Sequence, residues 1–461
     1  MNITDLPIEL QEHILSFLSV LQELQTASTV CTHWREICRS LYTVKHRIFR
    51  DHARAGRLVW RRVGGGEPVG LVRNGHHHRN GGHHHPFRSS QQAGGARVVT
   101  PPPRHLHRAV LHGHHMFIHG GDTTSGIYNG LYKLDILTNT WSKVIAREGV
   151  PPTPRSRFAM TKYGHHVFVT GGCNMSRGYV AVEYNDIYVY DLVENVWYSA
   201  GNLLQRRYTH GCVCLESEGD TIRLVLVGGL GTMCNMAVNV ELCTLSRDSN
   251  NRYRVSNSVL FPNTDTRMFH TQIKLDDHRV FVFGGRTMTE LGDDPSVPVV
   301  RQDASILTLS PDYTSLQISS VPMLNSNISV YSGLYPVVLD DFVVVGGRVI
   351  YLQQVIYTKE SRELPGFYVL DEGRCQTGLE ISKNRYFHTF ILDISEVGRG
   401  GAAKWVEVEN NPPAHAPFSS RFHTSVVAGD SIVVFGGTVQ DQRTKKSQDN
   451  NALYRVTVTN R

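Results

Sequence analysis

Arginine and tyrosine residues recur shortly before the apolar segments that end in glycine doublets. The set that could act on a ligand comprises Arg104, Arg157, Arg207, Tyr208, Arg267 and Arg421. A ring of such side chains around one opening would bind carboxylates through paired N–H donors and would stack on apolar groups. The same guanidinium groups could instead satisfy backbone carbonyls inside the protein. The pattern therefore predicts a substrate-binding face, with structural anchoring as the alternative.

A histidine-rich stretch is a candidate for metal binding. His76–His78 and His83–His85 lie in a glycine-rich segment, and neutral imidazoles are good ligands for zinc or copper. No cysteine or carboxylate accompanies these histidines, and a segment of this composition has no obvious scaffold. We interpret it as a solvated loop and predict neither a metal nor another cofactor.

Positive charge is concentrated in residues 45–108. This segment holds thirteen Lys or Arg residues and only two acidic ones, Asp51 and Glu67, although the whole chain has a net charge of only +6. Such a segment would attract nucleic acid or an anionic surface electrostatically. It lacks interleaved aromatic residues beyond Phe87, so we expect no specific nucleic-acid partner.

The sequence lacks the residue patterns of common enzymes. The glycine doublets do not open helices and do not carry the Lys-Ser/Thr signature of a phosphate-binding loop. Cys212 and Cys214 alternate onto one face of a predicted strand with no further zinc ligand nearby, which favours small core residues. No spacing assembles a Ser-His-Asp or Cys-His arrangement, and we predict no catalytic residue.

Six copies of an apolar tetrad followed by a glycine doublet organise most of the chain. The doublets are Gly120-Gly121, Gly171-Gly172, Gly228-Gly229, Gly284-Gly285, Gly346-Gly347 and Gly436-Gly437. Their first glycines are separated by 51, 57, 56, 62 and 90 residues. A doublet permits positive φ and the close approach of two backbones where a buried strand ends. A period near 50 indicates a repeat architecture.

A second strand and a tryptophan accompany several of the doublets. The segments Asn129 to Asp135 and Asn185 to Asp191 are each followed, six residues later, by Trp141 and Trp197. Trp405 has a comparable place in the last part of the chain. A large indole supplies an apolar wedge between neighbouring sheets. Four-stranded sheets that stack radially bury both faces and leave short edges, so we predict a mainly β propeller.

Two of the six copies lack the tryptophan, and the interval between the fifth and sixth glycine doublets is longer than the others. Tyr253 and Leu316 are the residues expected to substitute in the third and fourth copies. Residues 348–384 are interpreted as an insertion in the fifth copy, which gives six blades. A separate degenerate blade at Phe367 to Asp371 would give seven.

From about residue 98 to residue 461, these doublets, strands and tryptophans resemble a Kelch-repeat β-propeller. The last copy ends at Tyr454 to Val458 without an outer strand that carries Trp. An unassigned strand-like segment, Leu58 to Val63, includes Trp60 and precedes the first blade. We expect this segment to complete the last blade, which would remove an exposed sheet edge.

The first fifty residues change to a helical period. Leu10, Ile14, Phe17 and Leu18 form one apolar stripe, and a second stripe lies beside it. The apolar arc covers roughly half of the helix, which is more than one packing partner needs. Three short helices in about 45 residues bury too little surface to be comfortably stable alone. The apolar surface beyond what one packing partner needs predicts a helical partner protein. The alternative is that these helices pack onto the propeller.

Three blocks in this region resemble an F-box over residues 3–48. They are Leu6-Pro7-Ile8-Glu9-Leu10, Ile14-Leu15-Ser16-Phe17-Leu18 and Val30-Cys31-Thr32-His33-Trp34-Arg35. The resemblance implies a small three-helix domain that docks onto the Skp-type adaptor of a cullin-RING ubiquitin ligase. The implied adaptor-binding residues are Leu6, Pro7, Ile8, Leu10, Ile14, Leu15 and Val30.

Together these features predict a non-enzymatic substrate receptor in three parts. Residues 3–48 form the F-box domain, 49–97 a linker, and 98–461 a six-bladed Kelch propeller that binds an unknown protein substrate. The partners implied are the Skp-type adaptor and, through it, a cullin scaffold. A Kelch interaction scaffold outside ubiquitination is the alternative. A second alternative is a copper oxidase of the kind built on Kelch propellers, but the F-box-like segment at the start of the sequence argues against it.

Location is predicted from what the sequence lacks. No apolar run approaches the roughly 18 residues that a membrane-spanning helix needs, so we expect no membrane partner. The first residues do not resemble a secretory signal, and the eight cysteines are scattered. We expect a cytoplasmic or nuclear protein, or one present in both compartments.

Overall fold

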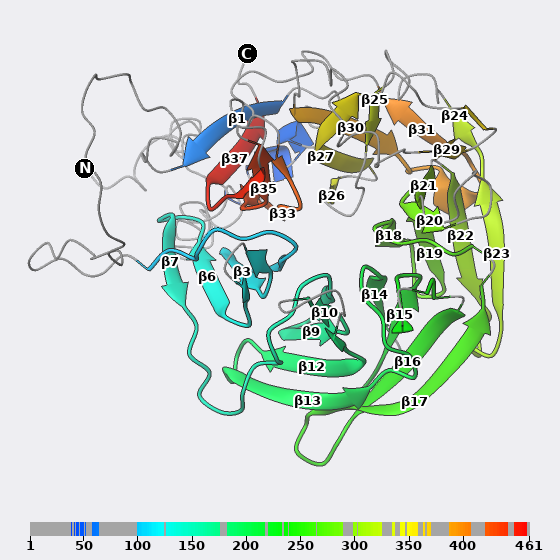
Figure 1. The fold of residues 1–461 in the computed structure, drawn as a ribbon, viewed down its shortest axis with the longest axis horizontal. Helices are drawn as coiled ribbons and strands as arrows, with labels where there is room; N and C mark the ends of the chain where they lie inside the picture. The colour runs from blue at the N-terminus through cyan, green and yellow to red at the C-terminus, as the bar shows by residue number, and fades with distance from the viewer. Residues whose placement is uncertain are drawn as a thin grey trace, which may run out of the picture.

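The fold is built from short antiparallel sheets set around a central axis (Figure 1). The computed structural model describes residues 38, 41, 43–45, 47–49, 51, 58–63, 99–123, 126–175, 182–216, 220–232, 235–237, 239–263, 265–288, 298–301, 303–324, 334–336, 342–345, 348–357, 363–364, 367–369, 387–406, 420–440 and 447–458. Among these residues, no helix is long and apolar enough to cross a membrane.

The first four blades each contain four antiparallel strands in meander order. Blade 1 contains β2 (Arg108–His112), β3 (His115–His119), β6 (Leu131–Asp135) and β7 (Thr140–Lys143). Blade 2 contains β8 (Ala159–Tyr163), β9 (His166–Thr170), β12 (Asp186–Asp191) and β13 (Val196–Asn202). Blade 3 contains β14 (Gly211–Glu216), β15 (Thr221–Val227), β16 (Asn239–Arg247) and β17 (Tyr253–Pro262). Blade 4 contains β18 (Thr271–Lys274), β19 (Arg279–Phe283), β22 (Ala304–Leu309) and β23 (Leu316–Val321).

Blades 5 and 6 depart from this plan. Blade 5 contains β24 (Met323–Leu324), β25 (Leu334–Pro336), β26 (Phe342–Val345), β27 (Arg348–Tyr357), β30 (Phe387–Asp393) and β31 (Ala403–Val406). A short 3-10 helix, η5 (Val397–Arg399), precedes β31. Blade 6 contains β33 (Thr424–Ala428), β34 (Ser431–Phe435), β37 (Leu453–Val458) and β1 (Leu58–Val63).

The strand β1 pairs antiparallel with β37, and Trp60 lies opposite Val456. Blade 6 therefore takes its outer strand from the start of the chain and its other three strands from the end. The two ends of the propeller are thus held in one sheet, and β37 has no exposed edge.

The prediction of a mainly β, six-bladed propeller is confirmed. The prediction that residues 348–384 are an insertion is wrong for residues 348–357, which form β27 between β26 and β30 of blade 5. In the rest of the insertion, the strand β29 (Phe367–Val369) does not build a seventh blade. It joins a sheet with β20 (Arg286–Met288), β21 (Pro298–Arg301) and β28 (Glu363–Leu364). The insertion therefore extends the connection that follows the doublet of blade 4.

The apolar core lies between neighbouring blades. Trp141 packs on Phe435 of blade 6 with ring centroids 4.7 Å apart, and Trp405 packs on Phe283 of blade 4 at 5.5 Å. Tyr253 of blade 3 is buried and meets Phe168 of blade 2 at 5.6 Å. The aromatic wedges predicted from the sequence thus each contact the preceding blade, and Tyr253 substitutes for Trp in the third copy.

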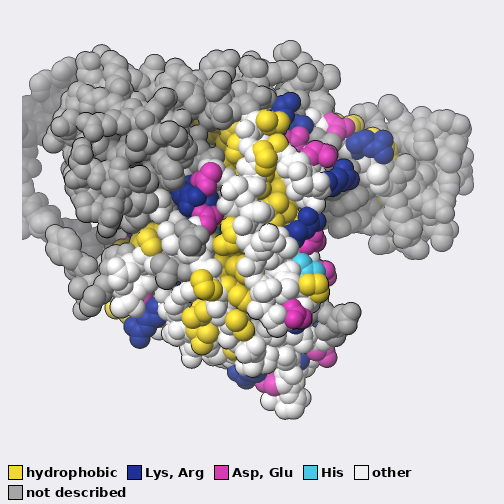
Figure 2. All heavy atoms as spheres, turned by 90° about the vertical axis from the view of Figure 1, so that its right-hand side faces the viewer, with side chains coloured by type: hydrophobic (Ala, Val, Ile, Leu, Met, Phe, Trp, Pro, Cys, Tyr) yellow, Lys and Arg dark blue, Asp and Glu magenta, His cyan; other side chains and the backbone are white. Residues whose placement is uncertain are grey.

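The outer rim also carries apolar side chains. Figure 2 shows the rim on the side of β22 and β23, where hydrophobic side chains form a band with charged side chains beside it. In β23, the outer strand of blade 4, only Val321 is buried. Leu316 of the same strand is half-buried and packs against the cluster shared by blades 3 and 4, as expected for the residue that replaces tryptophan.

Short hairpins follow several glycine doublets and form a collar at that end of the propeller. They are β4 (Asp122–Thr123) with β5 (Gly126–Ile127), β10 (Cys173–Asn174) with β11 (Val182–Glu183), β20 with β21, and β35 (Thr438–Gln440) with β36 (Ser447–Asp449) and β32 (Ser420–Arg421). We call this end the mouth. The turns between the two inner strands of each blade lie at the other end.

Among the described residues of the helical segment before β1, Phe49 contacts the propeller. Phe49 is buried and packs with Val343, Ile391 and Val456 of blades 5 and 6. Val44 and Ile48 remain more than 40% exposed. The predicted adaptor-binding residues Leu6, Pro7, Ile8, Leu10, Ile14, Leu15 and Val30 lie outside the described residues, as does the histidine-rich stretch.

Candidate functional site

A four-residue motif leads into the innermost strand of five blades. We call residues 104–107, 155–158, 207–210, 267–270 and 420–423 the entry motifs. Position 1 is Arg, except for Ser420, and position 4 is His, except for Phe158. Position 3 has a φ between +53° and +57° in every copy. Because non-glycine residues rarely adopt this conformation, five repeats of it show that the motif imposes one backbone shape around the mouth.

The position 1 arginines are structural anchors. Arg104, Arg155, Arg207 and Arg267 are fully buried. Each donates through Nη1 to the first carbonyl of its own glycine doublet, with distances of 2.8, 2.8, 3.4 and 3.0 Å. The prediction that Arg104, Arg207 and Arg267 present guanidinium groups to a substrate is therefore wrong, since these donors satisfy carbonyls at the ends of buried strands.

The four arginines are neutralised in two different ways. Arg207 pairs with Glu241 at 3.2 Å, and both side chains are fully buried. Arg155 pairs with Asp186, and Arg267 with Asp265. Arg104 lies instead 4.9 Å from the ring centres of Tyr128 and Tyr132, where the π faces attract the cation. Burial lowers the pKa of Arg207 and raises that of Glu241, and their contact compensates for that cost.

The glycine doublets link each blade to the next. The second glycine donates its N–H to the position 1 carbonyl of the following blade, from Gly172 to Arg207 at 2.9 Å and from Gly229 to Arg267 at 2.8 Å. The same bond from Gly437 to Arg104, at 2.8 Å, joins blade 6 to blade 1. A Cβ on Gly228 would lie 2.0 Å from the carbonyl oxygen of Arg267, so the blades approach closely because these positions are glycine.

The position 3 residues form a ring of backbone hydrogen bonds at the mouth, which we call the mouth ring. The N–H groups of four of these residues, all except Phe422, donate to the carbonyl of the position 3 residue in the previous blade, at 2.8 to 3.4 Å. The ring runs through Phe422, Leu106, Arg157, Thr209 and Phe269. The rings of Phe269 and Phe422 lie 6.3 Å apart, on the side where blade 5 has no described member of the ring.

Of the predicted substrate-binding residues, Arg157 alone has a described side chain that reaches the mouth. It is 20% exposed, lies 3.7 Å from Asp122 of β4, and donates to Ser156 at 3.2 Å. Tyr208 is buried, and its backbone bridges to Leu230. The backbone of Arg421 pairs with Thr438, and its side chain is outside the described set.

Arg155 is the residue that the sequence reasoning missed. Arg157 and Arg421 were grouped with the other arginines, although they occupy positions 3 and 2 of the motif rather than position 1. An Arg followed three residues later by His or Phe marks the true repeat, and that spacing identifies Arg155. The structure therefore separates two sets that arginine content alone placed together.

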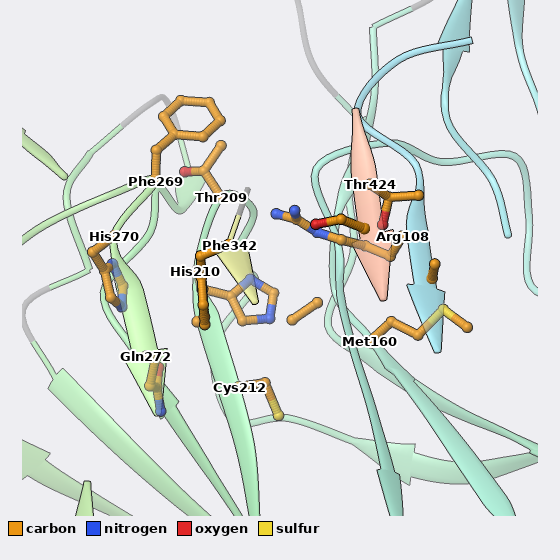
Figure 3. A pocket seen from close by; sticks show the side chains of 14 residues that line it. Arg108, Met160, Thr209, His210, Cys212, Phe269, His270, Gln272, Phe342 and Thr424 are labelled. Carbon is orange, nitrogen blue, oxygen red and sulfur yellow. The ribbon is translucent and has the colours of Figure 1, made fainter. Parts of the chain in front are cut away.

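The central channel contains a cavity of about 190 Å³. Every blade contributes an inner residue to it: Arg108, Met160, Cys212, Gln272, Phe342 and Thr424. Figure 3 shows Arg108 extending into this space opposite His210 and His270. A typical small-molecule site measures about 300–1,000 Å³, so the cavity is small for an organic ligand.

The buried histidines of the channel carry no charge at neutral pH. Burial lowers the pKa of His210 well below its usual range, and it lowers the pKa of His270 and His423 to about 3. Arg108 donates through Nε to the carbonyl of Phe158 at 3.2 Å, and an arginine side chain in a protein is a cation. Cys212 is a neutral thiol because burial raises its pKa. The cavity therefore combines one positive charge with neutral polar groups.

The copper oxidase alternative requires two tyrosines, two histidines and a cysteine at one point. Among the described residues that line the cavity, His210, His270 and Cys212 are present and no tyrosine is. Tyr208 is buried at a neighbouring position with its backbone in the collar. The described residues that line the cavity therefore do not bring together the two tyrosines, two histidines and cysteine that a copper oxidase requires.

The mouth surface mixes ion pairs with apolar groups. His105 lies 2.8 Å from Asp449 of the blade 6 collar, and Arg157 lies near Asp122 of the blade 1 collar. The ring of Phe422 lies 6.2 Å from that of His105, the ring of Phe269 lies 6.3 Å from that of Phe422, and both phenylalanines are only partly buried. Aromatic side chains surrounded by polar ones are typical of surfaces that bind proteins.

Two family models match the chain. A model described as "KLHDC2/KLHL20/DRC7 Kelch-repeats domain" matches residues 88–285, and one described as "F-box-like" matches residues 3–51. The stretch from Ile14 to Trp34 resembles F-box only protein 42. The matches support the combination of F-box and Kelch repeats and not that particular member.

Curated relatives match parts of the propeller. The chain is 26% identical to "Kelch domain-containing protein 1" of Mus musculus over 204 residues, which cover 38% of this chain and 47% of the relative. It is 26% identical to "Kelch-like protein 25" of Rattus norvegicus over 181 residues, 38% of this chain and 27% of the relative. The chain thus spans less than half the length of these relatives. A solved structure titled "Structure of YjhT" has a TM-score of 0.47 and 13% identity, and the match covers 78% of this chain and 99% of that one.

Proposed function

The chain is an F-box/Kelch-repeat protein, and from this premise we propose that it is the substrate-recognition subunit of an SCF-type cullin-RING ubiquitin ligase. The F-box docks onto a Skp-type adaptor, which connects it to a cullin scaffold. The mouth of the propeller binds the protein to be ubiquitinated. The observation that carries the proposal is the union of an F-box-like match with a six-bladed propeller in one chain.

The contribution to ubiquitin transfer is proximity. Phe49 packs against blades 5 and 6, and β1 enters blade 6 nine residues later. The end of the F-box match and the strand that follows it are therefore attached to the propeller at two nearby points. A short attachment raises the effective concentration of a bound substrate near the ligase's catalytic subunits. The architecture is typical of non-catalytic adaptor proteins, so the bond-making step belongs to those subunits.

The free thiols of the propeller support a reducing compartment. Cys173, Cys212, Cys214 and Cys243 form no disulfide, and such thiols persist in the cytosol and nucleus. We include a cytoplasmic or nuclear location in the proposal. A tagged chain found mainly in the secretory pathway would contradict that part.

The test separates the two binding surfaces. The full chain is co-expressed with a Skp-type adaptor, and the double variant Leu10→Glu/Ile14→Glu should lose adaptor co-purification because it places charge on the predicted helix stripe. Val44→Glu, at an exposed helical position outside the predicted contact set, is the matched control and should retain the adaptor. The double variant should still capture the proteins that the propeller binds, but these should no longer be ubiquitinated.

The same experiment decides between the proposal and its alternative. If the unmodified chain does not co-purify with the adaptor, the protein is a Kelch interaction scaffold outside ubiquitination. If ubiquitination of captured proteins continues in Leu10→Glu/Ile14→Glu after adaptor binding is lost, the F-box does not connect this chain to the ligase and the proposal is wrong.

A further inference from the structure

Two turns at the end of the propeller opposite the mouth share a sequence that the proposed function does not use. Blade 1 has Gly113-His114-His115 and blade 2 has Gly164-His165-His166 between the two innermost strands. Each turn faces an aspartate at the end of the third strand, Asp135 in β6 and Asp191 in β12. We call these two groups the opposite turns. From their geometry we propose that the blade 2 turn binds a divalent transition metal, zinc above all, through His165, His166 and Asp191.

The tight turn brings the two histidines together. Successive residues in a strand point to opposite faces, so two neighbouring histidines would normally diverge. Here Tyr163 pairs with His166, which leaves Gly164 and His165 as a two-residue turn. Gly164 has a φ of +55°. The rings of His165 and His166 consequently lie 4.1 Å apart at an angle of 36°, on the same side as Asp191.

The distances among the three groups fit metal ligands better than hydrogen bonds. Oδ2 of Asp191 lies 3.3 Å from Nε2 of His166 and 3.6 Å from Nε2 of His165. Hydrogen bonds from N–H to oxygen are about 2.7–3.2 Å long. Zinc binds imidazole nitrogen and carboxylate oxygen at about 2.0–2.2 Å, and tetrahedral ligands at that radius are separated by roughly 3.3–3.6 Å. All three ligand atoms lie within 4.8 Å of one another.

The surrounding chain already orients two of the three ligands. Oδ1 of Asp191 accepts the N–H groups of Val193 and Glu194 at 2.8 and 2.9 Å, so Oδ2 is the oxygen that faces the histidines. The ring of His166 is almost completely buried and meets Tyr253 edge to face at 5.0 Å. Outer contacts of this kind hold metal ligands in place and strengthen binding. The proposed site is therefore largely pre-formed.

One coordination position is left for a ligand from outside. His165 is 40% exposed, so the site opens to the surface. Three protein ligands with an open fourth position hold a water or an exchangeable group. The site is separate from the mouth, because β9 carries the chain over five residues, about 16 Å, from His166 to the doublet.

The blade 1 turn is a looser copy of the same arrangement. Asp135 accepts the N–H groups of Leu137 and Thr138 through Oδ1, as Asp191 does in its own turn. Its Oδ2 lies 3.9 Å from Nε2 of His114, and His115, the counterpart of the buried His166, is only half-buried. Because its ligands are farther apart and less constrained, this turn should bind the same metal more weakly.

The test uses the full chain with serine in place of each histidine in His76–His78 and His83–His85, since that stretch would bind zinc non-specifically. Zinc binding is measured by competition with a chromogenic chelator and by the rise in melting temperature on addition of Zn²⁺. The parent should bind one zinc ion tightly and a second more weakly. His165→Ala and Asp191→Asn should each weaken the tighter binding by about 100-fold or more, since a lost ligand costs at least as much as a lost outer contact.

Control variants make each result decisive. Asp191→Asn keeps an oxygen for Val193 and Glu194, so its melting temperature without metal should match the parent. His278→Ala changes the equivalent turn of blade 4, where His278 stacks on Tyr313, and should leave zinc affinity unchanged. A parent chain that binds no zinc, or Asp191→Asn and His165→Ala variants that bind zinc as the parent does, would overturn the proposal.

Discussion

The entry motifs and the opposite turns occupy the two ends of the same inner strands but use their polar residues differently. At the mouth, Arg207 is completely buried against Glu241 and the doublet carbonyl. At the other end, Asp191 is also buried but lies 3.6 Å from His165, whose side chain is 40% exposed. Residues that were predicted to bind a ligand thus hold the propeller together, whereas the proposed metal site lies in turns that the sequence analysis did not single out. Polar residue type alone does not distinguish these uses.

The largest effect should come from breaking an entry motif. Arg207→Met would leave Glu241 buried without its partner, which costs about 3–5 kcal/mol of the free energy of unfolding. Urea unfolding followed by tryptophan fluorescence would measure it. Arg147→Met, which removes an exposed pair with Glu194, should barely change stability. The double variant Arg207→Met/Glu241→Met should recover much of the loss, and no recovery would contradict the assignment of a buried pair.

A glycine exchange compares the two ends directly. Gly228 and Gly113 have nearly the same φ, +60° and +59°, but a Cβ on Gly228 would strike the carbonyl of Arg267 whereas Gly113 faces open space. Gly113→Ala should cost about 1–2 kcal/mol from backbone strain alone. Gly228→Ala should cost about 2–5 kcal/mol because the clash adds to the strain. Equal thermal unfolding of the two variants would show that close approach of the blades is unimportant.

The buried histidines of the entry motifs predict a dependence on pH. Burial lowers the pKa of His107 well below its usual range, so below pH about 6.5 the unfolded chain binds a proton that the folded chain does not. The stabilisation is complete above that pH and is lost as the pH falls. His107→Phe, which copies Phe158 of blade 2, should reduce the loss between pH 7.5 and 5.5 by about 1.4 kcal/mol. Urea unfolding of the parent and the variant at both pH values measures this loss of stability. An equal loss in the two proteins would show that His107 is not the residue responsible.

The smallest effect on stability should accompany a change at the mouth ring. Arg157→Glu alters a side chain that is partly exposed beside Asp122, so the melting temperature should change by no more than a few degrees. Binding of substrate proteins by the full chain should decrease, because the charge at the mouth is reversed. Arg147→Glu on an exposed outer loop is the control. Loss of binding in both variants would indicate a general charge effect rather than a site.

Much of the fold could be predicted because the repeat is local. Each glycine doublet, aspartate and tryptophan marks a strand end or a wedge within its own copy, so six copies imply six blades. The pairing of β1 with β37 could be anticipated from one missing strand and one unassigned segment. The binding site was harder to predict from the sequence. Arg155 and Arg157 are two residues apart in one chain segment, yet Arg155 is fully buried and the side chain of Arg157 reaches the mouth.

The sequence by itself determined the repeated architecture, the F-box-like start and the identity of the residues available for binding. Only the tertiary structure decided which of them face a neighbour's carbonyl and which face solvent. That choice depends on contacts between blades, such as the Gly229 N–H on the carbonyl of Arg267 and the edge of Tyr253 on His166. Such contacts join residues tens of positions apart, and no local pattern of residue types specifies their distances or burial.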